Sequence, residues 1–243
     1  YTTIDDPSSV FQRTLYTGTG SSLAVTNGGN SDLQPDLVWL KPRGITEGHF
    51  WTDSVRGVQK TIRSYRANAE ETESQGLTAF NSDGFTMGTN SDINTNTEPG
   101  VAWQWKKTAD AGFNIVGYSG TGSTATVSHG LGVVPSLIIL KCRTNANPDW
   151  IVFGKALGGT VGSEFAKLNN TGAKTTGLDT SWFNQTAPTS SVFTVGTQLD
   201  VNASSNTYIA YCFADVKGYS KFGTYVGNGN ADGTFVYTGF KPA

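Results

Sequence analysis

Charged residues, methionine, cysteine and histidine are all scarce in this sequence of 243 residues. Charged residues make up only 15% of the chain, against about a quarter in an average globular protein, and the formal net charge is −2. No cluster of Lys and Arg is present, so strong electrostatic binding to nucleic acid is not expected. No apolar run approaches the roughly 18 residues that a membrane-spanning helix needs, so no membrane insertion is expected.

The scarcity of metal-binding side chains argues against a metal or cofactor. The two histidines, His49 and His129, occupy unrelated places, whereas zinc needs three or four closely spaced ligands. Gly18-Thr-Gly20 and Gly120-Thr-Gly122 resemble half of a dinucleotide fingerprint, but strand-like sequence follows them instead of the required helix. We therefore predict no cofactor, and we interpret these glycines as turn residues.

What the chain has in abundance is glycine, with 30 residues, and aromatic side chains, at 12%. This much apolar and aromatic material excludes a disordered chain. The sequence lacks the Ala, Glu, Lys and Leu richness of a coiled coil, and its glycines have no three-residue period as in collagen. The composition therefore favours an all-β protein.

The main feature is internal repetition at an offset of 100 to 108 residues. The matching segments, in order, are Phe11 to Ser21 with Phe113 to Ser123, Pro35 to Arg43 with Pro135 to Arg143, Phe85 to Asn94 with Phe193 to Asn202, and Val101 to Trp105 with Ile209 to Phe213. Conserved order and gap-free identities indicate duplication of one module.

Three segments follow from this repetition. Residues 1–111 are predicted to be a first module and residues 112–221 a second. Residues 222–243 begin a third copy, since Tyr225-Val-Gly227-Asn-Gly229 repeats the Tyr-x-Gly-x-Gly start. This last segment is either the start of a truncated third repeat, which we favour slightly, or a set of strands that complete the second module.

Both modules are expected to be antiparallel β-sandwiches of lectin-like or jelly-roll-like type. Leu37 to Lys41 and Leu137 to Lys141 are short apolar runs, each preceded by Pro, and predict buried strands. Val101 to Trp105 and Tyr208 to Phe213 are rich in aromatic or β-branched residues, as strands are. Ala67 to Ser74 is the one plausible helix, and it lacks an apolar face, so it fits a loop equally well.

Cys142 and Cys212 fall inside two of the predicted strands. A disulfide requires those strands to be neighbours with suitable Cβ geometry. The first module has Pro42 and Gln104 at the matching positions, so its fold needs no bridge. Buried free thiols are therefore favoured, with a bridge as the alternative.

A pair of oxygen-bearing residues recurs in both modules, as Asp92 with Asn94 and as Asp200 with Asn202. On a strand, residues two apart point to the same face, so both oxygens could reach one calcium ion. Two oxygens are too few for calcium, which takes six to eight ligands. A turn with side-chain hydrogen bonds to the backbone is the preferred interpretation, and calcium is kept as the alternative.

The candidate binding residues are Trp51, Asp53, Trp150 and Trp182, because these tryptophans lie beside polar or turn-rich stretches. An exposed indole ring with nearby Asp and Asn is a typical sugar-binding arrangement, and burial under a loop is the competing interpretation. No catalytic residue is predicted. Glu47, Asp53, Glu71 and Asp149 could supply a glycosidase pair only if the fold brought two of them together.

The repeated motif resembles a known module. Its elements are Tyr-x-Gly-x-Gly, Pro-x-Leu-x-x-Leu-Lys-x-Arg, Asp53-Ser-Val-Arg-Gly57, Ser82-Asp-Gly-Phe85 and Ala102-Trp-x-Trp105-Lys. Together they are similar to a repeated module of uncharacterised function in tail and other virion structural proteins of marine bacteriophages, including cyanophages. The second copy departs from it, with Val152-Phe-Gly-Lys155 in place of the Asp-Ser-Val-Arg-Gly element.

The resemblance implies a virion component without agreed catalytic residues. We therefore expect a non-enzymatic phage protein, a tail fibre or receptor-binding component, that forms a homo-oligomer and contacts other virion proteins and a host surface glycan. The alternatives are a capsid decoration protein without a ligand and a tail-associated glycan-degrading enzyme.

Overall fold

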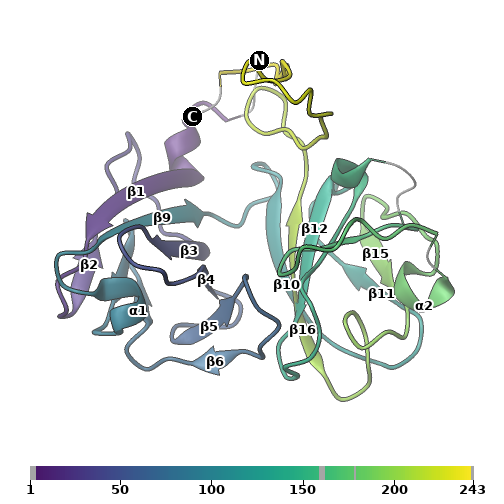
Figure 1. Cartoon of the computed structure of the whole chain (residues 1–243), viewed down its shortest axis with the longest axis horizontal. Coiled ribbons are helices and arrows are strands. Elements are labelled where there is room, and N and C mark those ends of the chain that lie inside the picture. Colours follow the sequence, from purple (N-terminus) through teal and green to yellow (C-terminus); the bar gives the residue numbers. More distant parts are fainter. Residues whose placement is uncertain (1–3, 159–161, 178, 242–243) are drawn as a thin grey trace.

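The computed structural model describes residues 4–158, 162–177 and 179–241 and shows an all-β protein built from antiparallel sheets (Figure 1). We call residues 4–111 the first half and residues 112–221 the second half. Apart from strands, the described residues contain only short helical turns, which are η1 (Pro7–Ser9), α1 (Ser91–Asn94), η2 (Lys155–Leu157) and α2 (Thr180–Phe183).

The first half contains one large and one small sheet. Its strands are β1 (Phe11–Thr17), β2 (Leu23–Val25), β3 (Leu37–Pro42), β4 (Phe50–Asp53), β5 (Lys60–Arg63), β6 (Glu71–Thr72), β7 (Leu77–Phe80), β8 (Phe85–Met87) and β9 (Pro99–Trp105). The large sheet has the strand order β1-β9-β3-β4-β5-β6, and the small sheet has the order β2-β8-β7.

The second half has a similar pair of sheets. Its strands are β10 (Phe113–Ser119), β11 (Ala125–Ser128), β12 (Leu137–Cys142), β13 (Ile151–Phe153), β14 (Ala166–Lys167), β15 (Val192–Val195) and β16 (Thr207–Phe213). The large sheet has the order β10-β16-β12-β13-β14, and β11 pairs with β15. In both halves the last strand therefore lies between the first strand and the strand that follows the repeated Pro.

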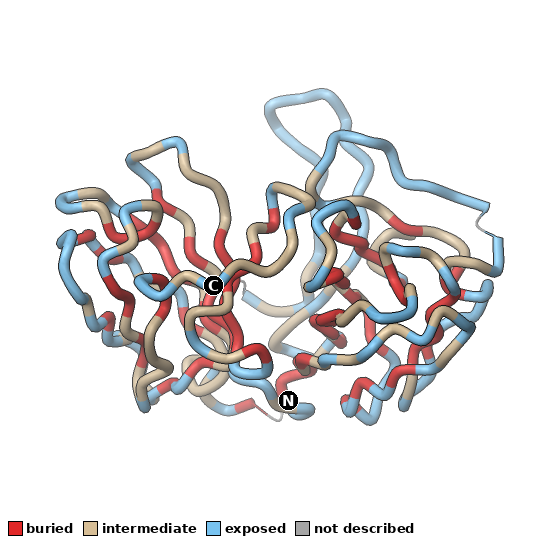
Figure 2. Tube along the Cα trace, turned by 90° about the horizontal axis from the view of Figure 1, so that it is seen from below, coloured by how far each residue is buried: buried red, intermediate tan, exposed pale blue. Residues whose placement is uncertain are grey.

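Each half buries its own apolar core. In the first half the core takes Val38 and Leu40 from the large sheet and Phe85 and Met87 from the small sheet. In the second half a corresponding cluster forms around Leu140, Phe193 and neighbouring residues. Figure 2 shows buried residues running through both halves, while the connecting loops are mostly exposed.

The turn between β7 and β8 shows why the turn-rich sequence suits this fold. Gly84 has φ of +93°, and its amide donates to the carbonyl of Leu33 at 2.9 Å. A Cβ at Gly84 would lie 2.0 Å from the carbonyl oxygen of Val25, so only glycine fits there.

The predicted strands at 37–41, 101–105, 137–141 and 208–213 are confirmed as parts of β3, β9, β12 and β16. The helix considered at 67–74 is absent, and that stretch contains the short strand β6 instead. The Asp92–Asn94 pair lies in the helical turn α1, in agreement with the preferred turn interpretation and not with the strand that the calcium alternative assumed. Residues 222–241 form no strand, so the structure adds no described strand to the second half there.

The cysteines are free and buried. β12 and β16 are paired, but Cys142 lies opposite Tyr208 and Cys212 lies opposite Ile138. The two thiols are thus displaced by four residues along the ladder, about 13 Å at the usual rise per residue. A disulfide cannot span that separation.

Candidate functional site: the junction of the two halves

The two large sheets are joined by a third apolar cluster. This cluster contains Leu37, Trp51 and Ile62 from the first half with Phe113, Ile115, Trp150, Ile209 and Tyr211 from the second. The small sheets lie on the outer sides of the molecule (Figure 1). The large sheet of each half is therefore covered on both faces, by its own small sheet and by the other half.

Aromatic rings dominate this junction. The ring centroid of Trp51 lies 4.8 Å from that of Tyr211 and 5.3 Å from that of Trp150, both in edge-on contact. Trp39 lies 4.8 Å from Trp51 on the other side. Edge-on pairs of this kind each contribute about 0.5–1.5 kcal/mol beyond the buried area.

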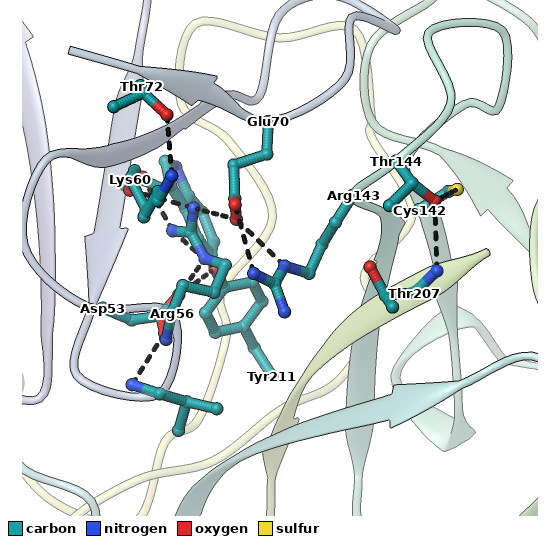
Figure 3. A network of polar contacts seen from close by, with 12 residues as sticks. Asp53, Arg56, Lys60, Glu70, Thr72, Cys142, Arg143, Thr144, Thr207 and Tyr211 are labelled. Carbon is teal, nitrogen blue, oxygen red and sulfur yellow. Dashed lines mark hydrogen bonds and ion pairs between the residues drawn. The ribbon is translucent and has the colours of Figure 1, made fainter.

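A buried ionic network lies beside the aromatic rings (Figure 3). Asp53 Oδ2 accepts hydrogen bonds from Arg56 Nε at 2.5 Å and from the Tyr211 hydroxyl at 2.7 Å. Asp53 Oδ1 accepts from the amides of Val55 and Arg56. The side chains of Asp53 and Arg56 are both fully buried, so neither charge is exposed to water.

The guanidinium of Arg56 is held by four further groups. It donates to the carbonyls of Trp51 and Lys60 at 2.9 and 3.0 Å and contacts Glu70 and the Tyr211 hydroxyl at 3.4 and 3.3 Å. Burial acts to lower the pKa of Arg56, but the carboxylate of Asp53 and its other neighbours outweigh burial and raise it. Burial also raises the pKa of Tyr211 well above its ordinary value, so its hydroxyl remains a donor.

Glu70 links the same network to the second half. Its carboxylate accepts two hydrogen bonds from Arg143, from Nε at 2.9 Å and from a terminal nitrogen at 3.1 Å. The backbone amide of Glu70 also donates to the carbonyl of Arg143 at 2.8 Å. This bidentate geometry fixes orientation as well as charge.

Two further polar contacts cross the junction. Lys141 is buried and donates from Nζ to the carbonyls of Ala67 and Pro148, at 2.8 and 2.9 Å. Burial lowers the pKa of Lys141 to about 8. The indole Nε1 of Trp150 donates to the carbonyl of Arg63 at 3.1 Å. The loop between β5 and β6 is therefore anchored to the second half at several points.

A cavity of about 210 Å³ opens at one side of the junction. Its aromatic lining consists of Trp39, Trp51, Trp105, Phe113, Phe213, Tyr219 and Phe222. Apolar cavities of about 150 Å³ hold a benzene-sized molecule, so this one has room for an apolar ring. Among the described residues its lining contains no carboxylate or imidazole, and the hydroxyl-bearing residues in it are Tyr219 and Ser220.

Exposure of the ring, which sugar binding requires, is wrong for two of the three candidate tryptophans, and the competing interpretation of burial holds for them. Trp51 is 1% exposed and Trp150 is 0% exposed. The carboxylate of Asp53 is already bound by Arg56 and Tyr211. Trp182 is partly buried in α2, with its ring centroid 4.2 Å from that of Phe165. The structure thus brings Trp51, Asp53 and Trp150 together inside the junction and leaves Trp182 elsewhere.

The other side chains that make polar contacts across the junction were not chosen as candidate site residues from the sequence. They are Arg56, Glu70, Lys141, Arg143 and Tyr211. The element Asp53-Ser-Val-Arg-Gly57 carried a usable signal, since its Asp and Arg are three residues apart and pair directly. Tyr211 lies 158 residues from Asp53, and no local pattern links the two.

Three of the four carboxylates considered for glycoside hydrolysis are engaged by cations, and Glu47 is the exception. Asp53 pairs with Arg56, Glu71 pairs with Arg63 at 3.0 Å, and Asp149 pairs with Lys167 at 2.6 Å. Burial acts to raise the pKa of Asp149, but hydrogen bonds from Lys167 and Asn169 outweigh it and lower it. Such a carboxylate is ionised and unsuited to act as a general acid at neutral pH.

The recurring Asp and Asn residues also have structural partners. Asn94 is buried; its side-chain oxygen accepts from the amide of Thr19, and its side-chain nitrogen donates to the carbonyls of Ser21 and Gly88. Asn202 makes the same set of contacts in the second half, with Thr121, Ser123 and Gly196.

The aspartates of the two recurring pairs also have partners within the protein. Asp92 contacts Arg63 at 3.0 Å, and Asp200 accepts from the amide of Asp149 at 2.8 Å. In the part of the chain that the structure describes, no group of three or more His, Cys, Asp or Glu residues is placed to hold a metal ion. Among the same residues, no helix is long and apolar enough to cross a membrane.

Comparison with known proteins gives one match. A family model described as a domain of unknown function, DUF7483, matches residues 6–243. The curated proteins yield no match to the chain, and the solved structures yield none either.

Proposed function

The chain belongs to the DUF7483 family, and we propose that it is a non-enzymatic structural protein of a bacteriophage particle, acting as a tail fibre or receptor-binding component. The observation that carries the non-enzymatic part of this proposal is the junction. The carboxylate of Asp53 and the guanidinium of Arg56 neutralise each other, and the lining of the cavity is mostly apolar and aromatic. The phage assignment is supported by the sequence resemblance of the repeated motif.

The proposal includes duplication of a β-sandwich module, with residues 1–111 and 112–221 as the two copies. Two sets of matched contacts and a matched strand order support it. The Tyr16 hydroxyl donates to the Ile93 carbonyl, as Tyr118 does to Val201. The matched sheet orders and the matched contacts of Asn94 and Asn202 point the same way.

The junction suits an assembled and mechanically loaded component. Buried aromatic rings, a buried Asp–Arg pair and a bidentate Glu–Arg pair join the halves through many contacts. Breaking such a junction would expose apolar surface and unpaired charges together, and both are costly. The two modules would therefore act as one rigid block.

The decisive experiment is localisation. An antibody raised against this chain should label purified particles of the phage that encodes it, and electron microscopy would show the label on the tail. Label on the capsid would favour the decoration alternative, and unlabelled particles with the chain absent from their protein content would contradict the proposal.

A host surface glycan is proposed as a partner through Trp182, which is the one candidate ring that keeps exposed surface. Binding on a glycan array that Trp182→Ala abolishes would support this partner. Homo-oligomerisation is a separate expectation, and a strictly monomeric mass in solution and in the particle would contradict it. The glycan-degrading alternative would require product release from a polysaccharide substrate.

A further inference from the structure

A cavity of about 540 Å³ lies at the outer edge of the large sheet in the first half. β1 forms that edge, because among the described residues it pairs with β9 on one side and with no strand on the other (Figure 1). The lining consists of Ser8, residues 11–15 of β1, Gly28, Gly29 and Trp103 of β9. Small-molecule sites typically occupy about 300–1,000 Å³, so this cavity has the size of a ligand site.

An arginine and a tryptophan are neighbours in this cavity. Arg13 and Trp103 are directly opposite each other in the register of β1 and β9. Their side chains therefore share one face of the sheet, with Cβ atoms about 4.5–5.5 Å apart. Arg13 is exposed and Trp103 is partly exposed. The ring of Trp103 also contacts Trp39, with ring centroids 5.1 Å apart, so the indole is held in place while part of its surface stays open.

The guanidinium of Arg13 has no carboxylate partner among the described residues, which sets it apart from most arginines of the chain. Arg56, Arg63, Arg66 and Arg143 each form an ion pair with a glutamate or aspartate. A free guanidinium beside an open indole surface matches a ligand that carries both a negative charge and an apolar face.

The second half shows what happens to the same face where protein covers it. Ile115 and Tyr211 occupy the places of Arg13 and Trp103 in the repeat and are likewise opposite each other. They are 4% and 0% exposed, because they pack in the junction against the first half. An apolar protein surface laid over Arg13 would bury an unpaired guanidinium, which is costly. This part of the face is therefore suited to an anionic ligand and not to a further apolar layer.

A loop that is fixed to β1 limits the shape of the ligand. Gln12 Nε2 donates to the carbonyl of Ser31 at 2.8 Å, and Gln12 Oε1 accepts from the amide of Gly29 at 2.9 Å. Thr14 Oγ1 donates to Asn27 Oδ1 at 2.8 Å. Because Gly29 of this loop also lines the cavity, an added strand has no clear run along β1 at that point. A compact ligand fits better than an extended peptide.

We propose that this cavity binds a saccharide that carries a carboxylate. The apolar face of a sugar ring packs on the indole of Trp103, since an indole combines an apolar body with a wet edge. The carboxylate accepts two hydrogen bonds from the fork of the Arg13 guanidinium. The inference rests on the proposed receptor-binding role and deepens it, because it names the chemical class of the glycan and a place for it apart from Trp182.

The probe is a trisaccharide of galacturonic acid, and its methyl ester is the matched neutral ligand. Isothermal titration calorimetry with the intact protein should show that the acid binds about tenfold more tightly than the ester, which corresponds to one hydrogen-bonded pair with a charged group. The preference for the acid should shrink as the salt concentration rises, because Arg13 is exposed.

The matched protein variants are Arg13→Gln and Arg43→Gln. Both arginines are exposed and neither has an ion pair among the described residues, so both variants should keep the melting temperature of the parent. Arg13→Gln should remove the preference for the acid, and Arg13→Lys should keep part of it, because lysine retains the charge but not the fork. Arg43→Gln, outside the lining, should bind both ligands as the parent does. Trp103→Leu should weaken the binding of acid and ester alike.

Equal affinity for the acid and the ester, equal effects of Arg13→Gln and Arg43→Gln, or no binding at millimolar concentration would overturn the proposal. So would a Glu-rich peptide that displaces the trisaccharide and binds more tightly in an Arg13-dependent way, because the occupant would then be a peptide. None of these results bears on where an antibody labels the phage particle, so failure of the saccharide site and failure of the proposed function are distinguishable.

Discussion

The hydroxyl of Tyr211 donates a hydrogen bond of 2.7 Å to Oδ2 of Asp53, across the boundary between the two halves and 158 residues away in sequence. Both residues are fully buried. The contact ties a buried carboxylate of the first half to a side chain of the second, and it leads to the first prediction.

Tyr211→Phe should lower the free energy of unfolding by about 1–3 kcal/mol, because it leaves a buried carboxylate with one donor fewer. Chemical denaturation followed by tryptophan fluorescence would measure the loss. Tyr225→Phe is the matched control, since the Tyr225 ring is exposed, and it should leave stability unchanged. Equal stability of the parent and Tyr211→Phe would show that the hydrogen bond makes no net contribution to the free energy of unfolding.

Removing the Arg56 guanidinium should lower the free energy of unfolding more than removing the Tyr211 hydroxyl does. Arg56→Met strands the buried Asp53 carboxylate, and breaking a buried pair in this way typically costs about 3–5 kcal/mol. Lys155→Met breaks a pair whose side chains are 52% and 34% exposed, and should change stability by less than about 1 kcal/mol. Similar losses in the two variants, measured by denaturant titration, would contradict the assigned burial of the network.

Stability should rise with pH in the alkaline range because of Lys141. Burial lowers the pKa of this ammonium to about 8, from 10.5 in the unfolded chain, so between these values the unfolded chain binds a proton that the folded protein has lost. The contribution is at most about 1.4 kcal/mol per pH unit. Denaturation at pH 7.5 and 10 should show this rise for the parent and a smaller one for Lys141→Met. Parallel pH profiles of the two proteins would refute the assignment.

The two cysteines should behave as inert buried thiols. Burial raises the pKa of Cys212 far above its ordinary value, so the reactive thiolate is scarce in the folded protein. A thiol reagent should label neither cysteine under native conditions and both in denaturant, as read by mass spectrometry. Reductant should leave the melting temperature unchanged. A melting temperature that falls with reductant would indicate a disulfide that the strand register forbids.

Asn94→Ala and Asn202→Ala should be about equally destabilising, by about 2–4 kcal/mol each, because each removes one acceptor and two donors from a buried turn. The measurement is again denaturant unfolding. Asn145→Ala, at an exposed turn, is the control and should stay near the parent. A large loss in one half alone would argue against equivalent roles, and calcium-dependent stability of the parent would revive the metal interpretation.

The sequence predicted the strands well because each is marked by a short run of apolar or aromatic residues. The apolar runs after Pro35 and Pro135 form β3 and β12, and the aromatic runs at 101–105 and 208–213 form β9 and β16. For Asp92 and Asn94 both a turn and a strand were considered, because Asp and Asn spacing alone does not separate the two, and the preferred turn interpretation is confirmed. The hydrogen bonds of Asn94 run to Thr19 and Ser21, more than 70 residues away.

The site was only partly predictable. Trp51 and Trp150 were chosen because their sequence neighbours are polar, and with Asp53 they make three of the four candidates members of the junction. Their expected exposure was wrong. Asp53, the polar neighbour of Trp51, is itself buried and neutralised by Arg56, and the second half covers Trp51 on β4, with Trp150 of that half packed against it.

The order of the residues alone determined that this chain is all-β, that its segments recur with a fixed order, and that glycines mark its tight turns, since each of these depends on side-chain alternation and turn chemistry over a few residues. Only the tertiary structure decided that the two large sheets face each other and that Asp53, Arg56, Glu70, Arg143 and Tyr211 form one network. Such arrangements depend on which distant faces exclude water together, and the sequence of either face does not specify its partner.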